Sequence, residues 1–464
     1  MPTPQTNEHA ASKTATLVKV LIAALLIRWV YCLALYFLQG DEALSGVDSA
    51  GLLANGVNFA DAFKSQTLQG WRWFGFDPYI MPLFTWTATV HVLVFGKWAT
   101  LSYALWQSVL DVVTCLLVYR MAAIINPSFA IPSVIAAAIN PTQIVLCGYF
   151  YTDVFFVFFV ALFLYGTVAW LSLPTWRMAL LIGIGLGAGL LVRPVMAPWV
   201  APYMAFLVIT SLVRRDLSAR RFGQIASAAL IFAVCFGSLL LRNVAIYNAW
   251  SITAQSGMHL SRWVAPLVRE AKDGTRWEKS YTELETRTVA RFGGIDNNPF
   301  VQSDRYHEVA VEELRSLGLV AIAKAWLFGA AINIGAPAVI LAQPIAHLPR
   351  TGFFATPGSS VPEKIWNFVF RSENNTYALV LLGGIIGVAI IRLIQLIGCV
   401  ILVRQGTPVA VLLFFVGWIG YILFANGPIS SPKYRLPLEP ILCVLTGAGW
   451  ATLRGKAKRS APIA

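Results

Sequence analysis

The amino-acid sequence predicts an all-α polytopic membrane protein. Hydrophobic residues make up 57% of the 464 residues, and charged residues make up only 12%. This composition is too apolar for a water-soluble chain of this length. Apolar stretches of about 20 residues, the length of a helix that crosses a bilayer, recur along the chain. Basic residues gather in the short loops between them, as is typical of membrane proteins.

Ten apolar stretches are expected to cross the membrane. A further stretch, 317–345, is interrupted at Gly335-Ala336-Pro337 and is expected either to span or to re-enter the membrane, because proline breaks a helix. The expected count is therefore about ten to twelve transmembrane helices. The ten stretches are 17–39, 99–120, 129–147, 150–171, 177–192, 195–213, 222–246, 376–403, 408–425 and 436–453.

The basic residues orient the chain. Ten spans place both ends on one side, and loop residues such as Arg214 and Arg404 fall on that same side. The positive-inside rule identifies it as the cytoplasm. We therefore predict a disordered cytoplasmic N-terminus over residues 1–16, a transmembrane domain over 17–453 and a basic cytoplasmic tail over 454–464.

The opposite, outer side carries the longer polar segments. Residues 40–80 form a first outer loop and residues 247–316 form a large outer loop, both predicted to be periplasmic. Residues 81–95 are apolar but too short to cross a bilayer. They follow an aromatic cluster, Trp71 to Phe76, of the kind found at membrane interfaces. We therefore predict an interfacial helix at 81–95.

Several kinds of site and partner have little support. The net charge of +13 is accounted for by the loops and the tail, so no nucleic-acid partner is predicted. The six cysteines lie in apolar stretches without the spacing of metal ligands, and the histidines match no metal or catalytic-triad motif. No cofactor is predicted, although a divalent metal is left open.

Acidic residues at the predicted outer border are the first candidates for chemistry. Asp41 and Glu42 directly follow the first span, where they either end a helix at the water interface or serve as an acid–base centre. Asp77 is a second polar residue at this border. Asp153 lies near the start of another span, where we favour capping of that helix. Positioning a sugar and completing the acidic centre are the alternatives for Asp153.

Cations at the same border are the second set of candidates. Lys433 and Arg435 lie in a turn between Pro432 and Pro437, where they either anchor a helix at the interface or bind phosphate. Arg193 lies at the outer end of its span and either holds a lipid phosphate or extends its charge to water.

Two charges lie near the middle of predicted spans. Arg28 and Asp111 are each isolated in an apolar stretch, and an unpaired charge at this depth is costly. We therefore predict that they form an ion pair between neighbouring helices.

The order of several motifs resembles that of the GT-C superfamily of glycosyltransferases, in the branch of the lipid A aminoarabinose transferases and the protein O-mannosyltransferases. In that branch an Asp-Glu pair follows the first span and a Leu-Ala-x-Gly segment closes the loop. Here Gly56 stands fifteen residues after Asp41. Further matching segments are Leu53-Ala54-Asn55-Gly56, Pro82-Leu83-Phe84-Thr85-Trp86, Val94-Phe95-Gly96, Gly187 to Pro194, and Tyr434-Arg435-Leu436-Pro437.

Two positions depart from the pattern of this branch. Ser45 replaces a tyrosine that usually stands four residues after the aspartate, and Ile80 replaces a lysine or histidine before the proline of the first loop. These departures indicate that the contacts with the donor differ in this chain.

The resemblance implies a GT-C-type bundle and an inverting glycosyltransferase. It would move a sugar from a polyprenyl-phosphate donor to a glycolipid, polysaccharide or protein acceptor, on the outer face of a bacterial inner membrane. The expected catalytic residues are Asp41, as general base, and Glu42. Donor-phosphate binding is expected from Arg435, Lys433, Arg193 and Tyr434, and substrate binding from Asp153, Asp77 and Ser45.

Two rival functions share most of these features. A transporter or flippase of glycolipids would have the same spans and basic inner loops, and a non-catalytic lipid-binding partner of an envelope assembly complex would bind lipid without turnover. Dependence of turnover on Asp41 separates the enzyme from both. The residues do not identify the donor sugar or the acceptor.

Overall fold

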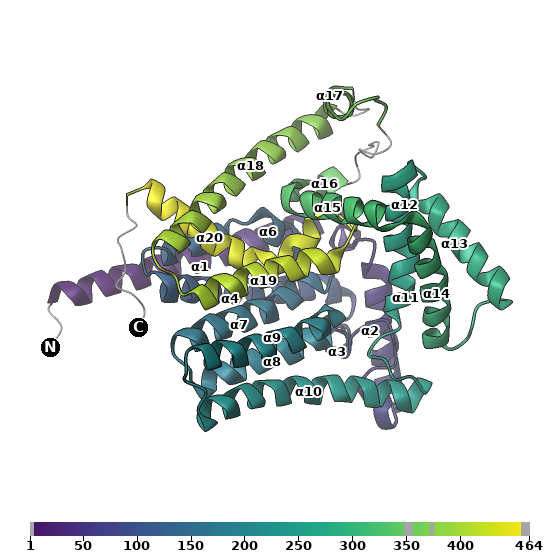
Figure 1. The fold of residues 1–464 in the computed structure, drawn as a ribbon, viewed down its shortest axis with the longest axis horizontal. Coiled ribbons are helices and arrows are strands. Elements are labelled where there is room, and N and C mark those ends of the chain that lie inside the picture. The colour runs from purple at the N-terminus through teal and green to yellow at the C-terminus, as the bar shows by residue number, and fades with distance from the viewer. Residues whose placement is uncertain (1–3, 347, 349–355, 372–374, 456–464) are drawn as a thin grey trace.

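The computed structural model is all-helical over the residues it describes, which are 4–346, 348, 356–371 and 375–455. Most of the long helices run side by side along the longest axis of the molecule, and one of them, residues 375–404, runs obliquely to it (Figure 1). They confirm the all-α fold class. These helices are α1 (Pro4–Gln39), α4 (Ala99–Ile125), α7 (Asp153–Ser172), α8 (Trp176–Val192), α9 (Ala197–Val213), α10 (Ala219–Tyr247), α18 (Asn375–Arg404), α19 (Val409–Asn426) and α20 (Glu439–Leu453).

Shorter helices complete the described part of the chain. The start of α1 and the end of α20 lie at one end of the bundle, whereas α2 and α11 to α14 gather at the opposite end (Figure 1). The shorter helices are α2 (Ser49–Lys64), α3 (Pro82–Phe95), α5 (Ala130–Ala138), α6 (Pro141–Cys147), α11 (Gln255–His259), α12 (Ala265–Asp273), α13 (Trp277–Phe292), α14 (Pro299–Leu317), α15 (Leu319–Gly335), α16 (Gln343–Ala346) and α17 (Val361–Phe370).

The chain is an integral membrane protein with many apolar spans. Among the described residues, eight helices are long and apolar enough to cross a membrane, or up to ten if each sharply bent pair of helices is counted as one span. Each of the ten expected stretches is helical over most of its length, although the helix of the first stretch already begins at Pro4. The stretch 129–147 forms two helices, α5 and α6, that meet at an angle of 43°, which is the geometry of a broken span or of a re-entrant loop.

The apolar segment Pro82–Ile125 is 44 residues long, too long for a single crossing, since a 20-residue helix is about 30 Å long. Gly96 has φ +55°, a backbone conformation that favours glycine, and it separates α3 from α4. The predicted helix at 81–95 is therefore present as α3. Its position at the membrane interface stays a prediction.

Helix α1 begins at Pro4, within the N-terminal arm. The predicted disorder of residues 1–16 stays a prediction. Most of the predicted cytoplasmic tail, residues 456–464, lies outside the described part of the chain.

Small residues bring α7 and α8 into close contact. A side chain at Gly185 would lie 2.7 Å from the backbone nitrogen of Phe163, and one at Gly183 would lie 2.8 Å from Ile231 on α10. Close packing at glycine is a common way for membrane helices to associate. The close contacts at Gly183 and Gly185 thus fix the position of α8, which ends just before Arg193.

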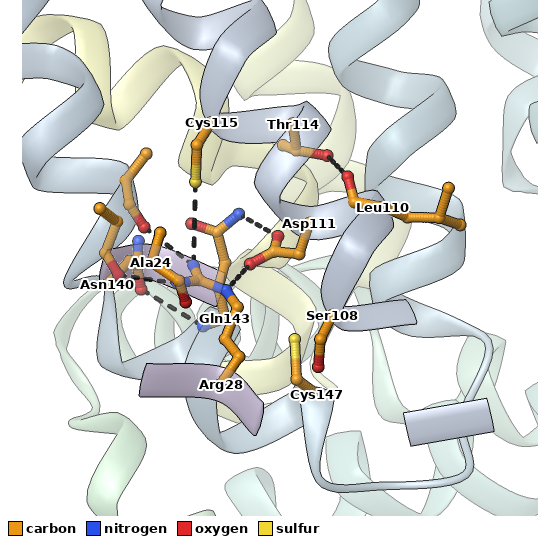
Figure 2. Close-up of polar contacts among 12 residues, drawn as sticks. Ala24, Arg28, Ser108, Leu110, Asp111, Thr114, Cys115, Asn140, Gln143 and Cys147 are labelled. Carbon is orange, nitrogen blue, oxygen red and sulfur yellow. Dashed lines mark hydrogen bonds and ion pairs between the residues drawn. The ribbon is translucent and has the colours of Figure 1, made fainter. Parts of the chain in front are cut away.

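The break between α5 and α6 is held by a buried ion pair. The Arg28 guanidinium donates to the carbonyl oxygens of Ala137 (3.1 Å) and Ala138 (2.8 Å), which lie at the end of α5. Its Nε lies 2.5 Å from Asp111 Oδ2, and Gln143 donates to the other Asp111 oxygen at 2.7 Å (Figure 2). The predicted pairing of Arg28 with Asp111 is confirmed, and it satisfies backbone groups that a break inside a membrane would otherwise leave unpaired.

We expect Arg28→Met to lower the free energy of unfolding by about 3–5 kcal/mol, because it leaves Asp111 as an uncompensated buried charge. Thermal unfolding in a fixed detergent measures this loss. The double variant Arg28→Met/Asp111→Leu should lose less than the sum of the two single changes. Arg177→Met, at an exposed position of α8, is the control, and an equal loss in that variant would contradict the role of the pair.

Candidate active site

The two carboxylates that open the first outer loop are exposed. Gly40, with φ +84°, turns the chain at the end of α1 into a 3-10 turn, Asp41–Leu44. The hydroxyl of Thr100, in the first turn of α4, donates to Asp41 Oδ1. Glu42 has no side-chain partner among the described residues. Asp41 is thus held in place through one oxygen, and Glu42 is free to bind a ligand.

The rest of this loop is fastened to the segment before α7. The amide of Phe150 donates to the carbonyl oxygen of Leu44 at 2.9 Å, and the Ser49 hydroxyl donates to the carbonyl oxygen of Phe150 at 3.1 Å. Gln343 donates to the backbone oxygen of Ser45 at 2.9 Å. The predicted substrate residue Ser45 therefore uses its backbone to hold the loop.

A single ion pair connects the first outer loop to the turn before α20. Lys433 Nζ lies 2.9 Å from Asp48 Oδ2, although the two residues are 385 positions apart. The ammonium also lies 4.7 Å from the ring centre of Tyr151 and 5.6 Å from that of Tyr434, distances at which a cation is attracted by an aromatic face. Lys433 and Tyr434 are therefore brought to the loop that carries Asp41.

A second ion pair lies at the end of α8. Arg193 Nη1 lies 2.6 Å from Asp153 Oδ1, and Asp153 is in the first turn of α7, where a carboxylate also interacts favourably with the helix dipole. Asp48 and Tyr434 are close enough to act electrostatically on Arg193. Four predicted site residues, Arg193, Asp153, Lys433 and Tyr434, thus form one polar cluster with Asp48.

His259, at the end of α11, is a member of this neighbourhood that the sequence did not single out. Desolvation and the nearby positive charge of Arg193 lower the pKa of His259 below its ordinary value, so that the imidazole is neutral at pH 7. No motif surrounds His259. Only the fold of the large outer loop brings it to Arg193.

Arg435 occupies a different place from the other predicted phosphate-binding residues. Its side chain is only 3% exposed and lies 2.7 Å from Glu439. Its Nη1 donates to the carbonyl oxygens of Asn333, Ile334 and Ala336 at 2.8–3.1 Å, at the end of α15. Like Arg28, it satisfies the backbone of an interrupted helix, so most of its donors are already used.

Asp77 also has a structural role. Its Oδ1 accepts hydrogen bonds from the amides of Tyr79 (2.7 Å) and Ile80 (3.1 Å), which is the geometry of an Asx turn. Its Oδ2 accepts from Asn55 at 3.1 Å. Asp77 therefore fixes the turn that leads into α3.

The Leu-Ala-x-Gly segment packs α2 against α3. The Thr85 hydroxyl donates to Asn55 Oδ1 at 2.8 Å, and the Thr89 hydroxyl donates to the Gly56 carbonyl oxygen at 3.2 Å. A side chain at Gly56 would lie 2.9 Å from Ala88 Cβ. This motif is thus explained by helix packing.

A cavity with a volume of about 930 Å³ lies within the helical bundle. Residues of α1, α5, α18 and α20 line it, together with Arg435, but Asp41, Glu42, Lys433 and Arg193 do not. Arg392 on α18 faces this cavity and donates to the carbonyl oxygen of Ile334 at 3.1 Å. Among the described residues, no carboxylate lies within ion-pair distance of Arg392.

The large outer loop carries a second cavity, of about 310 Å³. Trp263 and Trp277, in the same loop, do not line it. Their rings stack on each other instead, with centres 4.8 Å apart. In the part of the chain that the structure describes, no three His, Cys, Asp or Glu side chains are grouped so as to hold a metal ion.

Comparisons with known proteins agree with the class predicted from the sequence. Residues 78–240 match the family of dolichyl-phosphate-mannose-protein mannosyltransferases, which confirms the resemblance to this branch of lipid-phosphate-sugar glycosyltransferases; the match covers less than half of the chain. The crystal structure of apo ArnT from Cupriavidus metallidurans is similar at 15% identity and a TM-score of 0.36, over 95% of this chain and 78% of that chain. No curated protein sequence matches.

The two cations of the turn before α20 should respond differently to substitution. Arg435→Met should lower the free energy of unfolding by about 3–5 kcal/mol, because Glu439 and the α15 carbonyl groups lose their partner. Lys433→Gln should change the free energy of unfolding by about 1 kcal/mol or less, since Asp48, the ion-pair partner of Lys433, is exposed to solvent. Thermal unfolding of both variants measures the difference, and equal losses would contradict the separate roles.

Proposed function

We propose that the protein is an inverting glycosyltransferase that moves a sugar from a polyprenyl phosphate to an acceptor at the outer face of a bacterial inner membrane. The acceptor is a glycolipid, a polysaccharide or a protein. One observation carries the proposal: the Asp48–Lys433 ion pair holds the loop with the exposed Asp41 and Glu42 against the cations Lys433 and Arg193. The family that matches residues 78–240 is described by a sugar carried on a lipid phosphate, which supports a donor of this class.

Asp41 is proposed as the general base. A hydroxyl acceptor is a weak nucleophile, and a carboxylate within hydrogen-bond reach accepts its proton as the new bond forms. The hydrogen bond from Thr100 to Asp41 Oδ1 leaves the second carboxylate oxygen for the acceptor. Glu42, exposed and without a partner in the described chain, is placed to bind a hydroxyl of the donor sugar.

Lys433 and Arg193 are proposed to stabilise the leaving phosphate. The acceptor oxygen bonds to the anomeric carbon as the bond from that carbon to the phosphate oxygen breaks, and the lipid phosphate departs with the electron pair. A single displacement of this kind inverts the anomeric centre. Arg193 uses one of its nitrogens for Asp153, and Lys433 uses one donor for Asp48. The remaining donors can make charge-assisted hydrogen bonds to phosphate.

The lipid chain of the donor is proposed to occupy the cavity of about 930 Å³. The cavity reaches Arg435, two residues from Lys433, and continues between α5, α18 and α20 to Lys13 and Arg454 near the other end of the bundle. Most of its exposed wall is apolar, as an isoprenoid chain requires.

Asp41→Asn should lower the rate of sugar transfer by about 10²–10⁴-fold, the usual contribution of a general base, without loss of donor binding. Release of free polyprenyl phosphate from a polyprenyl-phosphate sugar, in membranes with matched expression, measures this rate. Asp61→Asn, an exposed carboxylate of α2, is the matched control. A wild-type protein that binds or translocates the donor but never cleaves it would support the transporter or the lipid-binding partner.

Ile391→Trp should raise the KM for the lipid donor by at least about tenfold. Ile391 lines the cavity of about 930 Å³, and the larger tryptophan side chain would occupy space that the isoprenoid chain needs. Ile390→Trp, the adjacent exposed position that does not line the cavity, is the control. The same KM in both variants would place the lipid chain elsewhere.

A further inference from the structure

A small polar cavity lies in the large outer loop, where α10 ends and α14 begins. Its volume is about 310 Å³, at the lower end of the range of about 300–1,000 Å³ that is typical of small-molecule sites. A ligand of one or two sugar rings is of this size class. The cavity lining includes Tyr247, Asn248, Trp250, Ser256, Phe300 and Asp304.

The walls of this cavity are held by hydrogen bonds that do not involve a ligand. Asn298 donates to the carbonyl oxygen of Tyr247 at 2.9 Å and accepts from the amide of Phe300 at 3.0 Å. The Ser303 hydroxyl accepts from the amide of Gly257 at 3.0 Å. The Tyr247 and Phe300 rings contact each other, with centres 5.4 Å apart. The cavity is therefore preformed, so a ligand need not order it on binding.

Three polar side chains at the cavity remain available. The Asp304 carboxylate, the Asn248 amide and the Ser256 hydroxyl have no side-chain hydrogen bond within the described residues. Beside them, Trp250 is 79% exposed. The cavity thus combines hydrogen-bonding groups with a large aromatic surface that has no protein cover.

The chemistry of the lining selects a neutral polyhydroxylated ligand. The lining contains one carboxylate, Asp304, and contains no lysine, arginine or histidine, so it offers nothing to neutralise a phosphate. Carboxylate, amide and hydroxyl groups can bond to sugar hydroxyls, and a site built in this way discriminates strongly against ligands that lack them. Aromatic rings such as Trp250 present an electron-rich face and large apolar area to the C–H face of a sugar.

The position of the cavity connects it to the proposed chemistry. Ser256 and His259 are three residues apart on α11, so they lie on the same side of the helix with a rise of about 4.5 Å between them. His259 is close enough to Arg193 to be affected by its charge. Thr253, also in the lining, donates to the carbonyl oxygen of Pro78 in the first outer loop at 3.1 Å. The cavity therefore lies about one helical turn from the neighbourhood of Arg193.

We propose that this cavity binds a neutral sugar unit of the acceptor, which makes the acceptor a glycan or glycolipid. The identification of the bound sugar as part of the acceptor rests on the proposed function. The binding of a sugar at this place depends only on the cavity itself.

The test is saturation-transfer NMR of the full-length protein in nanodiscs, with the methyl glycosides of mannose, glucose and galactose as probes and glycerol 1-phosphate as an anionic comparison. At least one glycoside should bind saturably, and glycerol 1-phosphate should not. Asp304→Asn and Trp250→Ala should each weaken glycoside binding by about tenfold or more, through loss of a charge-assisted hydrogen bond or of the aromatic contact. Trp366→Ala, at an exposed tryptophan of α17 outside the cavity, should have no effect.

The proposal is overturned if the wild type binds none of the glycosides, or if both cavity variants, folded by their thermal unfolding, bind them as the wild type does. A separate measurement addresses the proposed function. This measurement is the cleavage of the donor by water in the wild type without a glycoside, which depends on the proposed base Asp41 and not on the cavity. Glycoside binding without any donor cleavage would keep the sugar site and reject the glycosyltransferase. Donor cleavage without glycoside binding would do the reverse.

Discussion

Two buried arginine–carboxylate pairs hold together the interrupted helices on which the rest of this structure depends. A helix that ends inside a membrane leaves carbonyl groups with no water to bond them. Arg28 satisfies these groups at the end of α5, and Arg435 satisfies them at the end of α15. Asp111 and Glu439 neutralise the two guanidinium groups, so the breaks are compatible with a membrane interior.

Hydrogen bonds join the two pairs into one network. Asn140, at the break between α5 and α6, donates to Glu439 at 2.8 Å, and Arg435 donates to Thr142 at 3.0 Å in the first turn of α6. Gln143 in the same turn donates to Asp111. This network connects α1, which ends just before Asp41, with the turn that carries Lys433. It therefore sets the relative position of the carboxylates and cations of the candidate active site.

In the candidate active site, carboxylates hold the two cations that are proposed to bind the donor phosphate. Lys433 and Arg193 are each paired with a carboxylate but retain unused donors, so the cluster is balanced in charge before the donor binds. Arg435, two residues from Lys433, has all three of its nitrogens bound, to Glu439, to backbone carbonyl oxygens and to Thr142. Of these neighbouring cations in one turn, Arg435 holds the fold, and Lys433 is the one proposed to bind phosphate.

The sequence alone determined three features: the spans, the pairing of Arg28 with Asp111, and the exposed carboxylates after the first span. It did so because apolar length and the cost of unpaired charge in a membrane are local properties. The roles of Arg435 and Asp77 were decided by tertiary structure, since carbonyl and amide groups from distant segments determine which of their donors and acceptors are used. The same holds for His259 and the outer cavity: α11 and α14 are brought to the first loop only by folding. The physical reason is that a side chain's chemistry depends on its neighbours, and the sequence shows only those along the chain.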